Sequence, residues 1–197
     1  MEQVPCLHPL EGAPLPPKLE GFLEQGPAPV YVGFGSMTDP DPGATTRALL
    51  EALSQTGCRA LISRGWAGLA DGPLPEGVLA IGPVSHAELF PRLAAVVHHG
   101  GAGTTTTAAR AGVPQIVVPH VFDQFYWARR VTELGLGPPA PRRKRLAAQP
   151  LAESLAATLD NEVLLERARE LGERLRSRAA AEDALPFRFD GLDGADD

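Results

Sequence analysis

Short apolar runs alternate with longer amphipathic segments along most of this chain. Five apolar runs of strand length predict buried strands, namely PVYVGFGS (29–36), RALISR (59–64), VLAIG (78–82), AAVVHH (94–99) and QIVVPH (115–120). Strands that alternate with helices predict a parallel sheet that is covered on both faces. We therefore expect a single α/β domain with a Rossmann-like, doubly wound sheet of roughly six parallel strands.

The helical segments between these runs carry start and stop signals. The segment ATTRALLEALSQTG has apolar residues at helical spacing and ends at Gly57. The segment HAELFPRL predicts a short helix interrupted by Pro91, and DQFYWARRVTELG predicts a longer one. After Pro141 two more helices are expected, because each places a row of apolar residues on one face.

The ends of the chain differ from its middle. Residues 1–28 are rich in Pro and Gly, so we interpret them as a linker or arm with a short helix near 17–25, outside the core. Residues 29–185 form the expected domain, and residues 186–197 an acidic, Gly-rich tail. A basic stretch at 142–145 is interpreted as a solvated loop.

Composition narrows the class of protein. A length of 197 residues with 44% hydrophobic residues suits one compact domain, and a net charge of −6 argues against a nucleic-acid binder with a basic surface. Cys6 and Cys58 are too few for a disulfide scaffold or zinc site and fit a reducing cytoplasm. No signal peptide or stretch long enough for a transmembrane segment is visible.

The strongest local signal is the segment His98-His99-Gly100-Gly101-Ala102-Gly103-Thr104-Thr105-Thr106-Thr107, which we call the Gly-rich turn. It joins a buried strand to a helix. Glycines let the backbone approach a ligand closely, and a helix N-terminus favours anions, most naturally phosphate. Thr104 and Thr105 can cap the helix and donate hydroxyls. Neighbouring residues of a strand point to opposite faces, so one histidine is expected to pack inward while the other faces the ligand.

Two alternatives stay open for this turn. The glycines can serve only as a tight turn and the threonines only as caps, since short motifs often match by chance. A dinucleotide site is the other alternative: Gly101 and Gly103 match its pattern and Asp123 lies at about the right distance. However, Thr106 stands where that pattern has its third glycine. A Walker site is excluded because the turn has no lysine.

Further candidates follow the other strands at the same edge of the sheet. Gly33 to Ser36 can contact a diphosphate or form a simple turn. Trp66 can stack on a base, but we favour a place in the core. Gly82 and Val84 can offer backbone groups to a base. Asp123 is either a helix cap or, with Gln124, a pair suited to vicinal sugar hydroxyls. The aromatic residues at 125–127 are interpreted as packing residues.

Together these motifs resemble family 1 glycosyltransferases, above all bacterial antibiotic and sterol glycosyltransferases. The residues that carry the resemblance are VYVGFGS, LISRGW, IGPVSHAELFPRLAAVVHHGGAGTTTTAARAGVP and PHVFDQFYWARRV, within roughly residues 13–180. The family has the GT-B fold, in which two Rossmann-like domains face each other across a cleft. The C-terminal domain holds a UDP- or dTDP-sugar, and the other domain holds the acceptor and the catalytic base. Transfer inverts the anomeric centre and needs no metal or other cofactor.

The resemblance implies a role for each matching residue of this chain. His99 would contact the diphosphate and stabilise it as the leaving group. The phosphate-binding turn would comprise Gly101, Gly103 and Thr104, the sugar pair Asp123 and Gln124, and the base-binding segment Gly82 and Val84. Ile81 stands where plant members have a base-stacking Trp, and Thr107 where they have a ribose-binding Glu, which leaves UDP and dTDP both open.

The chain matches only the donor half of such an enzyme. We expect the N-terminal acceptor domain to be missing and the base to be unknown in this sequence. The half-enzyme would be inactive alone, and its open ligand face would favour self-association. A nicotinamide or other nucleotide-binding oxidoreductase and a non-catalytic nucleotide-sugar-binding partner are the remaining hypotheses.

Overall fold

A computed structural model describes residues 12–141 and 147–183, so the basic stretch at 142–145 and the tail at 186–197 lie outside the described residues. The strands are β1 (Val30–Gly33), β2 (Ala60–Ser63), β3 (Val78–Ile81), β4 (Ala95–His98) and β5 (Gln115–Val117). The helices are α1 (Pro17–Glu24), α2 (Pro42–Thr56), α3 (His86–Leu89), the 3₁₀ turn η1 (Phe90–Arg92), α4 (Ala102–Ala111), α5 (Gln124–Glu133), α6 (Ala148–Leu159) and α7 (Glu162–Asp183). The strands and helices predicted from the apolar pattern are therefore present.

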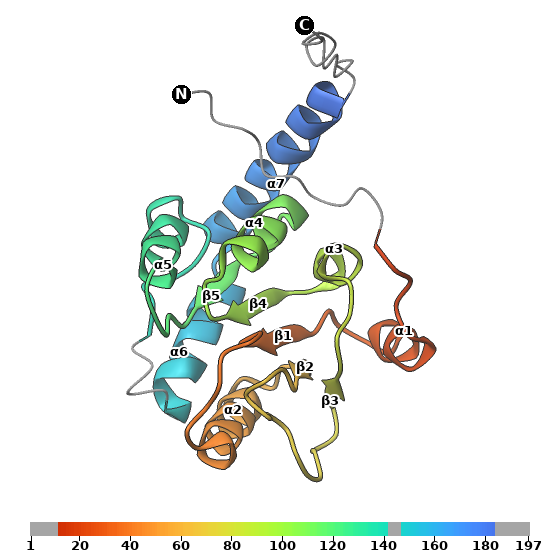
Figure 1. Cartoon of the computed structure of the whole chain (residues 1–197), viewed down its shortest axis with the longest axis vertical. Helices are drawn as coiled ribbons and strands as arrows, with labels where there is room; N and C mark the ends of the chain where they lie inside the picture. The colour runs from red at the N-terminus through yellow and green to blue at the C-terminus, as the bar shows by residue number, and fades with distance from the viewer. Residues whose placement is uncertain (1–11, 142–146, 184–197) are drawn as a thin grey trace, which may run out of the picture.

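The strands of the described residues form one parallel sheet in the order β3-β2-β1-β4-β5 (Figure 1). The sheet has five strands, one fewer than the roughly six we expect. The segment after α5 runs beside β5, where Leu136 O accepts the Gln115 N–H. Pro138, Pro139 and Pro141 follow, and a proline has no N–H with which to continue a ladder.

The order of the strands reverses direction between β1 and β4. Chain order runs outward from β1 through β2 to β3 on one side, and from β4 to β5 on the other. Ligands of open parallel sheets bind outside the carboxyl ends of the strands at such a switch point. Gly33 of β1 is the register partner of His98 of β4, so the first loop and the Gly-rich turn leave the sheet side by side at this point.

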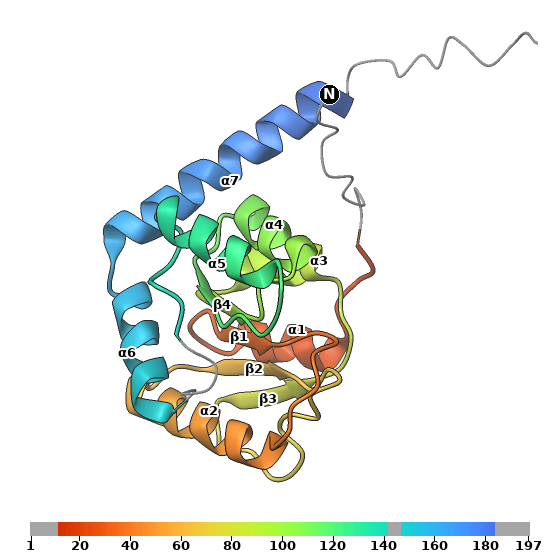
Figure 2. The same cartoon turned by 60° about the vertical axis from the view of Figure 1, so that its left-hand side comes forward.

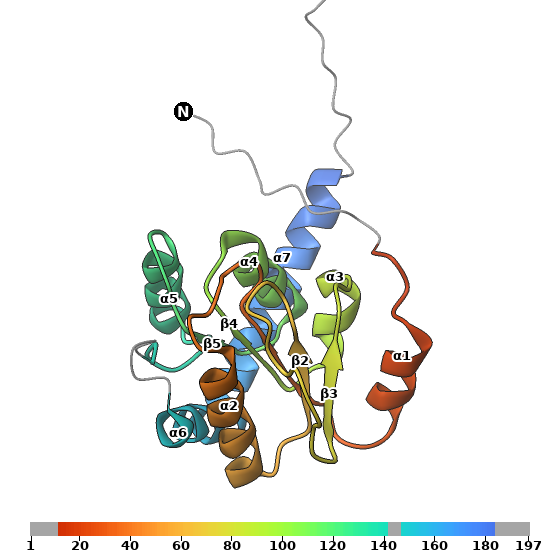
Figure 3. The same cartoon turned by 60° about the horizontal axis from the view of Figure 1, so that its bottom comes forward.

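Helices cover both faces of the sheet, as the doubly wound prediction requires. On one face α2 and α6 pack over Val30, Val32 and Ile62. On the other face α1, α3 and α4 pack over Tyr31, Leu61 and Val96. Figure 3 shows the sheet between these two layers. Neighbouring residues of each strand face opposite helix layers, and both layers are apolar. The strands therefore read as continuous apolar runs.

Helix α1 belongs to the core, contrary to the interpretation of its segment as an arm. Leu15, Leu19 and Leu23 are buried in the cluster under α3. Arg59 ties the end of the helix to the sheet, because its guanidinium donates to the carbonyls of Pro27 and Phe22. The proposed domain boundary at residue 28 stays a prediction, but the leucines at 15–23 pack as part of the same body.

Helix α7 crosses α4 and continues past the body of the domain (Figure 2). The crossing is close because glycines meet: a Cβ at Gly172 would lie 2.6 Å from Gly112 Cα. Arg176 adds a hydrogen bond to the Arg110 carbonyl. Among the described residues, no helix has the length and apolar character needed to span a bilayer.

Candidate functional site

The carboxyl edge of the sheet brings together the loops in which the sequence places the candidate site. Ser36 follows β1, Trp66 follows β2, Gly82 follows β3 and His99 follows β4. Asp123 closes the series after β5. The loops after β1 and β2 are bonded directly, since Trp66 N–H donates to Gly35 O at 3.0 Å. The predicted residues therefore share one edge, centred on the switch point between β1 and β4.

The two adjacent histidines differ in burial, as their alternation in the strand predicts. His98 is fully buried, and its Nε2 lies 2.9 Å from Gln115 Oε1 on β5. Its Nδ1 accepts the backbone N–H of Gly100 at 3.1 Å, so the ring proton must be on Nε2. Burial lowers the pKa of His98 to about 3, despite the opposing hydrogen bond to Gln115. His98 is thus a neutral, packed residue.

His99 lies at the mouth of the site between two glycines. A Cβ at Gly35 would approach its Cε1 to 3.0 Å, and a Cβ at Gly101 would approach its Nε2 to 2.6 Å. Its Nδ1 is buried and has no hydrogen-bond partner among the described residues. Desolvation lowers the pKa of His99, while the carboxylate of Asp123 acts in the opposite direction. A buried, unpaired imidazole nitrogen beside an open edge is a candidate contact for an anion.

The N-terminus of α4 is open. The helix begins at Ala102 with Gly101 as its N-cap, and no side chain caps it. Its first N–H groups have no intrahelical acceptor and carry a partial positive charge. The expectation that Thr105 caps the helix is wrong: its hydroxyl donates backward to Gly101 O at 2.9 Å. Thr104 lies within the first turn and Gly103 is exposed, so both border the open end.

Trp66 is exposed, and our preference for a place in the core is wrong. Its exposed fraction is 76%, because Gly65 adopts φ +49° and turns the chain outward. A Cβ at Gly65 would lie 2.6 Å from Gly35 O, so this turn requires glycine. Ser36 is exposed on the neighbouring loop. Both side chains are accessible to a ligand at the edge.

Asp123 and Gln124 are adjacent but differently placed. Asp123 is exposed at the N-cap position of α5, yet its side chain makes no capping hydrogen bond. Gln124 is buried, and its Oε1 accepts the backbone N–H groups of His120 and Val121 at 2.7 and 3.0 Å. One amide hydrogen of Gln124 points to Met37 Sδ, which leaves the second N–H for another acceptor. Gln124 therefore also shapes the loop before α5.

Aromatic side chains beside this pair face solvent. Phe122 is 90% exposed and has φ +46°, a conformation that is unusual for a residue with a side chain. Phe125 and Tyr126 are also exposed, contrary to their interpretation as packing residues, whereas Trp127 is half-buried and meets the Tyr126 ring edge to face. Trp66, after β2, is a further exposed aromatic residue that follows a strand.

The segment after β3 is held by a polar contact that sequence reasoning missed. Gly82 is exposed and Val84 is half-buried. His86, at the start of α3, has its Nε2 3.2 Å from the hydroxyl of Tyr31 on β1 and stacks on Phe90. Burial lowers the pKa of His86, and the nearby His99 adds to the effect. Only the spatial proximity of β1 and α3 reveals this contact, since 55 residues separate the partners.

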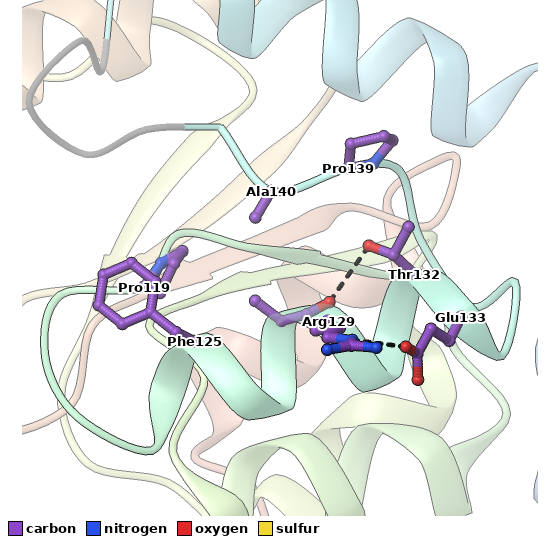
Figure 4. Close-up of a pocket in the computed structure, with 8 residues that line it drawn as sticks. Pro119, Phe125, Arg129, Thr132, Glu133, Pro139 and Ala140 are labelled. Atoms are coloured by element: carbon purple, nitrogen blue, oxygen red, sulfur yellow. Dashed lines mark hydrogen bonds and ion pairs between the residues drawn. The ribbon is translucent and has the colours of Figure 1, made fainter.

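Two concavities lie elsewhere on the domain. One of about 330 Å³ lies on the outside of α5 (Figure 4) and is lined by Pro119, Phe125, Ala128, Arg129, Thr132, Glu133, Pro139 and Ala140. Its polar groups are satisfied, because Arg129 pairs with Glu133 and Thr132 donates to the carbonyls of Ala128 and Pro138. The other, of about 260 Å³, lies near Pro114 and Arg169. Neither is lined by a predicted site residue.

The sequence between residues 51 and 185 matches the model of the erythromycin biosynthesis protein CIII-like C-terminal domain. The chain belongs to this family. Its arrangement of open helix N-terminus, histidine and aspartate is thus part of a glycosyltransferase C-terminal domain of the family 1 type, and the resemblance is confirmed. Among the described residues no group of three or more His, Cys, Asp or Glu side chains is placed to hold a metal ion.

Relatives of this C-terminal domain act on antibiotics and sterols. The chain is 48% identical over 127 residues to the vancomycin aglycone glucosyltransferase of Amycolatopsis orientalis, a match that covers 63% of this chain and 30% of that protein. It is 43% identical over 169 residues to a sterol 3-beta-glucosyltransferase of Arabidopsis thaliana, covering 83% of this chain and 27% of the relative. The chain thus spans less than a third of each.

Solved structures agree on the fold. The calicheamicin glycosyltransferase CalG4 matches with a TM-score of 0.68 and 28% identity, over 81% of this chain and 42% of that one. The glycosyltransferase SnogD from Streptomyces nogalater matches with a TM-score of 0.65 and 27% identity, over 87% and 45%. These likenesses confirm the predicted α/β class and the GT-B C-terminal half. None of these relatives is an oxidoreductase.

Proposed function

We propose that this domain binds a UDP- or dTDP-sugar at the carboxyl edge of its sheet and stabilises the diphosphate as it leaves. The transfer would invert the anomeric centre, and the acceptor would be a small natural product or a sterol-like molecule. The observation that carries the proposal is the open N-terminus of α4 beside the imidazole of His99, whose Nε2 lies against Gly101 and whose Nδ1 has no hydrogen-bond partner among the described residues. Both supply positive charge or N–H groups where negative charge develops during transfer.

The remaining loops provide places for the other parts of a nucleotide sugar. The exposed carboxylate of Asp123 would accept hydrogen bonds from the hydroxyls of the sugar. Gln124 would donate its second amide N–H to a sugar oxygen. The backbone at Gly82 and Val84 would meet the base, and Trp66 would stack beside it. Ser36, Gly101, Gly103 and Thr104 would surround the diphosphate.

The base that deprotonates the acceptor would come from a second, acceptor-binding domain. Three histidines of this domain are engaged elsewhere: His86 with the Tyr31 hydroxyl, His98 with Gly100 and Gln115, and His120, whose Nδ1 donates to the Val118 carbonyl. A general base must lie within hydrogen-bond reach of the proton that it removes. We expect the enzyme to act in a reducing cytoplasm, on the basis of its two cysteines.

Calorimetry with UDP, dTDP, GDP and NAD tests the donor site directly. UDP or dTDP should bind more tightly than NAD, and binding should persist in EDTA, since the site relies on helix N–H groups and an imidazole. Binding of NAD without binding of either pyrimidine nucleotide would reject the proposal. Multiple-turnover transfer to phenol, sterol or macrolide acceptors by this chain alone would reject the need for a second domain.

The Asp123→Ala variant separates the sugar from the diphosphate. It should weaken binding of the nucleotide sugar and leave the affinity for the bare nucleoside diphosphate nearly unchanged. The Gln124→Ala variant is the companion measurement, because Gln124 also holds two backbone N–H groups and its loss should lower stability too. An equal loss of affinity for both ligands in the Asp123→Ala variant would mean that this carboxylate has only a structural role.

A further inference from the structure

The Gly-rich turn is anchored from below by one buried side chain. His98 bonds to the turn through Nδ1, which accepts the Gly100 N–H at 3.1 Å, and to β5 through Nε2, which donates to Gln115 Oε1 at 2.9 Å. Without His98, the buried N–H of Gly100 would lack its acceptor. A buried backbone donor without a partner costs free energy, so the turn would have to move to find water or another acceptor.

Gly100 is also the place where two ligand-binding loops touch. A Cβ on Gly100 would lie 2.8 Å from Val117 Cγ1 and 3.0 Å from the backbone oxygen of Gln124. The residue adopts φ +91°, which places its backbone directly against the start of α5. The position of Gly100 therefore fixes the distance between the Gly-rich turn and the loop that carries Asp123.

We propose that His98 is a positioning residue, whose Nδ1 bond to Gly100 sets the Gly-rich turn in register with the Asp123 loop and thereby determines affinity for the diphosphate. This inference rests on the proposed function of the same edge. His98 does not touch the ligand; it acts through the backbone of Gly100. The bond to Gln115 has a different task, which is to join β4 to β5.

Because His98 is neutral, its Nδ1 is available as an acceptor for the Gly100 N–H. Full burial lowers the pKa of the imidazole to about 3, and the neighbouring His99 and His86 act in the same direction, while Gln115 opposes them. Nδ1 therefore stays an acceptor throughout the range in which His99, at the edge, can change its charge. The turn keeps its shape while the histidine beside it titrates.

Two substitutions of His98 test its two hydrogen bonds separately. An asparagine side chain accepts the backbone N–H two residues ahead, so His98→Asn retains an acceptor for Gly100 and loses the contact with Gln115. The longer side chain of His98→Gln reaches toward Gln115 and leaves the Gly100 N–H without its local acceptor. Both variants remove the aromatic ring, so each serves as the packing control for the other.

We expect both variants to melt at a lower temperature than the wild type and to differ in binding. His98→Asn should bind UDP or dTDP within about twofold of the wild type, and His98→Gln should bind about three- to tenfold more weakly, as the loss of one hydrogen bond implies. The nitrogen NMR signals of the wild-type imidazole should show the Nε2–H form from pH 5 to pH 8, with scalar coupling between Nδ1 and the Gly100 amide.

The outcomes separate this inference from the proposed function. A wild-type chain that binds UDP, dTDP and pyrophosphate, with equal weakening in both variants or with unchanged affinity in His98→Gln, contradicts the positioning role alone. An absent coupling to Gly100 also contradicts it, whatever the affinities. A wild-type chain that binds none of the three ligands contradicts the proposed function and this inference together.

Discussion

On the two faces of the sheet, apolar side chains are buried against helices; at the carboxyl edge, polar and aromatic groups are left open. The faces bury residues such as Leu61 and Leu155 completely. The edge leaves α4 uncapped, the Nδ1 of His99 unpaired among the described residues, and Phe122 exposed in a positive-φ conformation. Unsatisfied and strained groups are costly, so we interpret those at this edge as part of a candidate binding site. The comparison predicts that changes to the faces alter stability and changes to the edge alter binding.

The largest effect on stability is expected from a substitution on a buried face of the sheet. Leu155→Ala removes a fully buried side chain of α6 and should lower the free energy of unfolding by about 2–5 kcal/mol, measured by urea denaturation. The affinity of the folded fraction for UDP or dTDP should stay within about twofold of the wild type, a difference of less than 0.5 kcal/mol. A large loss of affinity at full folding would show that this face and the edge are coupled.

The His99→Ala variant should weaken ligand binding and leave stability nearly unchanged, which is the opposite of Leu155→Ala. Loss of a charge-assisted hydrogen bond to the diphosphate should weaken binding by about 1.5–3 kcal/mol in calorimetry. The melting temperature should change little, because the Nδ1 of His99 has no hydrogen-bond partner in the described part of the chain. If unfolding, instead of binding, responds to this substitution, the assignment of His99 to the ligand is wrong.

The pH dependence of ligand binding also tests whether His99 contacts the ligand. Desolvation lowers the pKa of His99 in the free protein, and a bound diphosphate would raise it. Binding would then take up a proton, so affinity should increase as the pH falls through the range of histidine titration. The His99→Ala variant should lose this dependence.

The smallest effect is expected at Phe122. Phe122→Gly relieves a positive φ at a side chain that is 90% exposed, so little packing is lost. We expect the free energy of unfolding to rise by up to about 1 kcal/mol, after the entropy cost of glycine is deducted. Nucleotide-sugar affinity should fall or stay constant. A destabilised variant would show that the aromatic ring has packing contacts that outweigh the strain.

The sequence predicts the sheet well because its strands are buried on both faces. Each strand therefore reads as an apolar run, and the alternation of helices and strands leaves few topologies. The sequence does not predict the packing of helix α1, since a Pro- and Gly-rich setting conceals the four-residue spacing of Leu15, Leu19 and Leu23. The sequence also predicts one strand more than the structure has, because the prolines after β5 prevent a further ladder.

At the site, the sequence predicts the loops and the phase of the two histidines, but not contacts between distant segments. Gln115, the partner of His98, lies on the neighbouring strand and carries no local signal. The exposure of Trp66 depends on Gly65 fitting against Gly35, which only the folded arrangement of β1 and β2 determines. Likewise, Gln124 matches a sugar-binding position in the family pattern, and its bonds to backbone groups become visible only in three dimensions.

The glycine contact between α4 and α7 has a consequence for the opposite end of α4. Because a Cβ at Gly172 would lie 2.6 Å from Gly112 Cα, the C-terminal end of α4 packs against α7 with the two backbones in close contact. An anion at the N-terminus of α4 would then bind to a helix whose opposite end is packed against α7. We expect a side chain at Gly172 to push α7 away from α4 and so to disturb the helix whose N-terminus forms the proposed anion site.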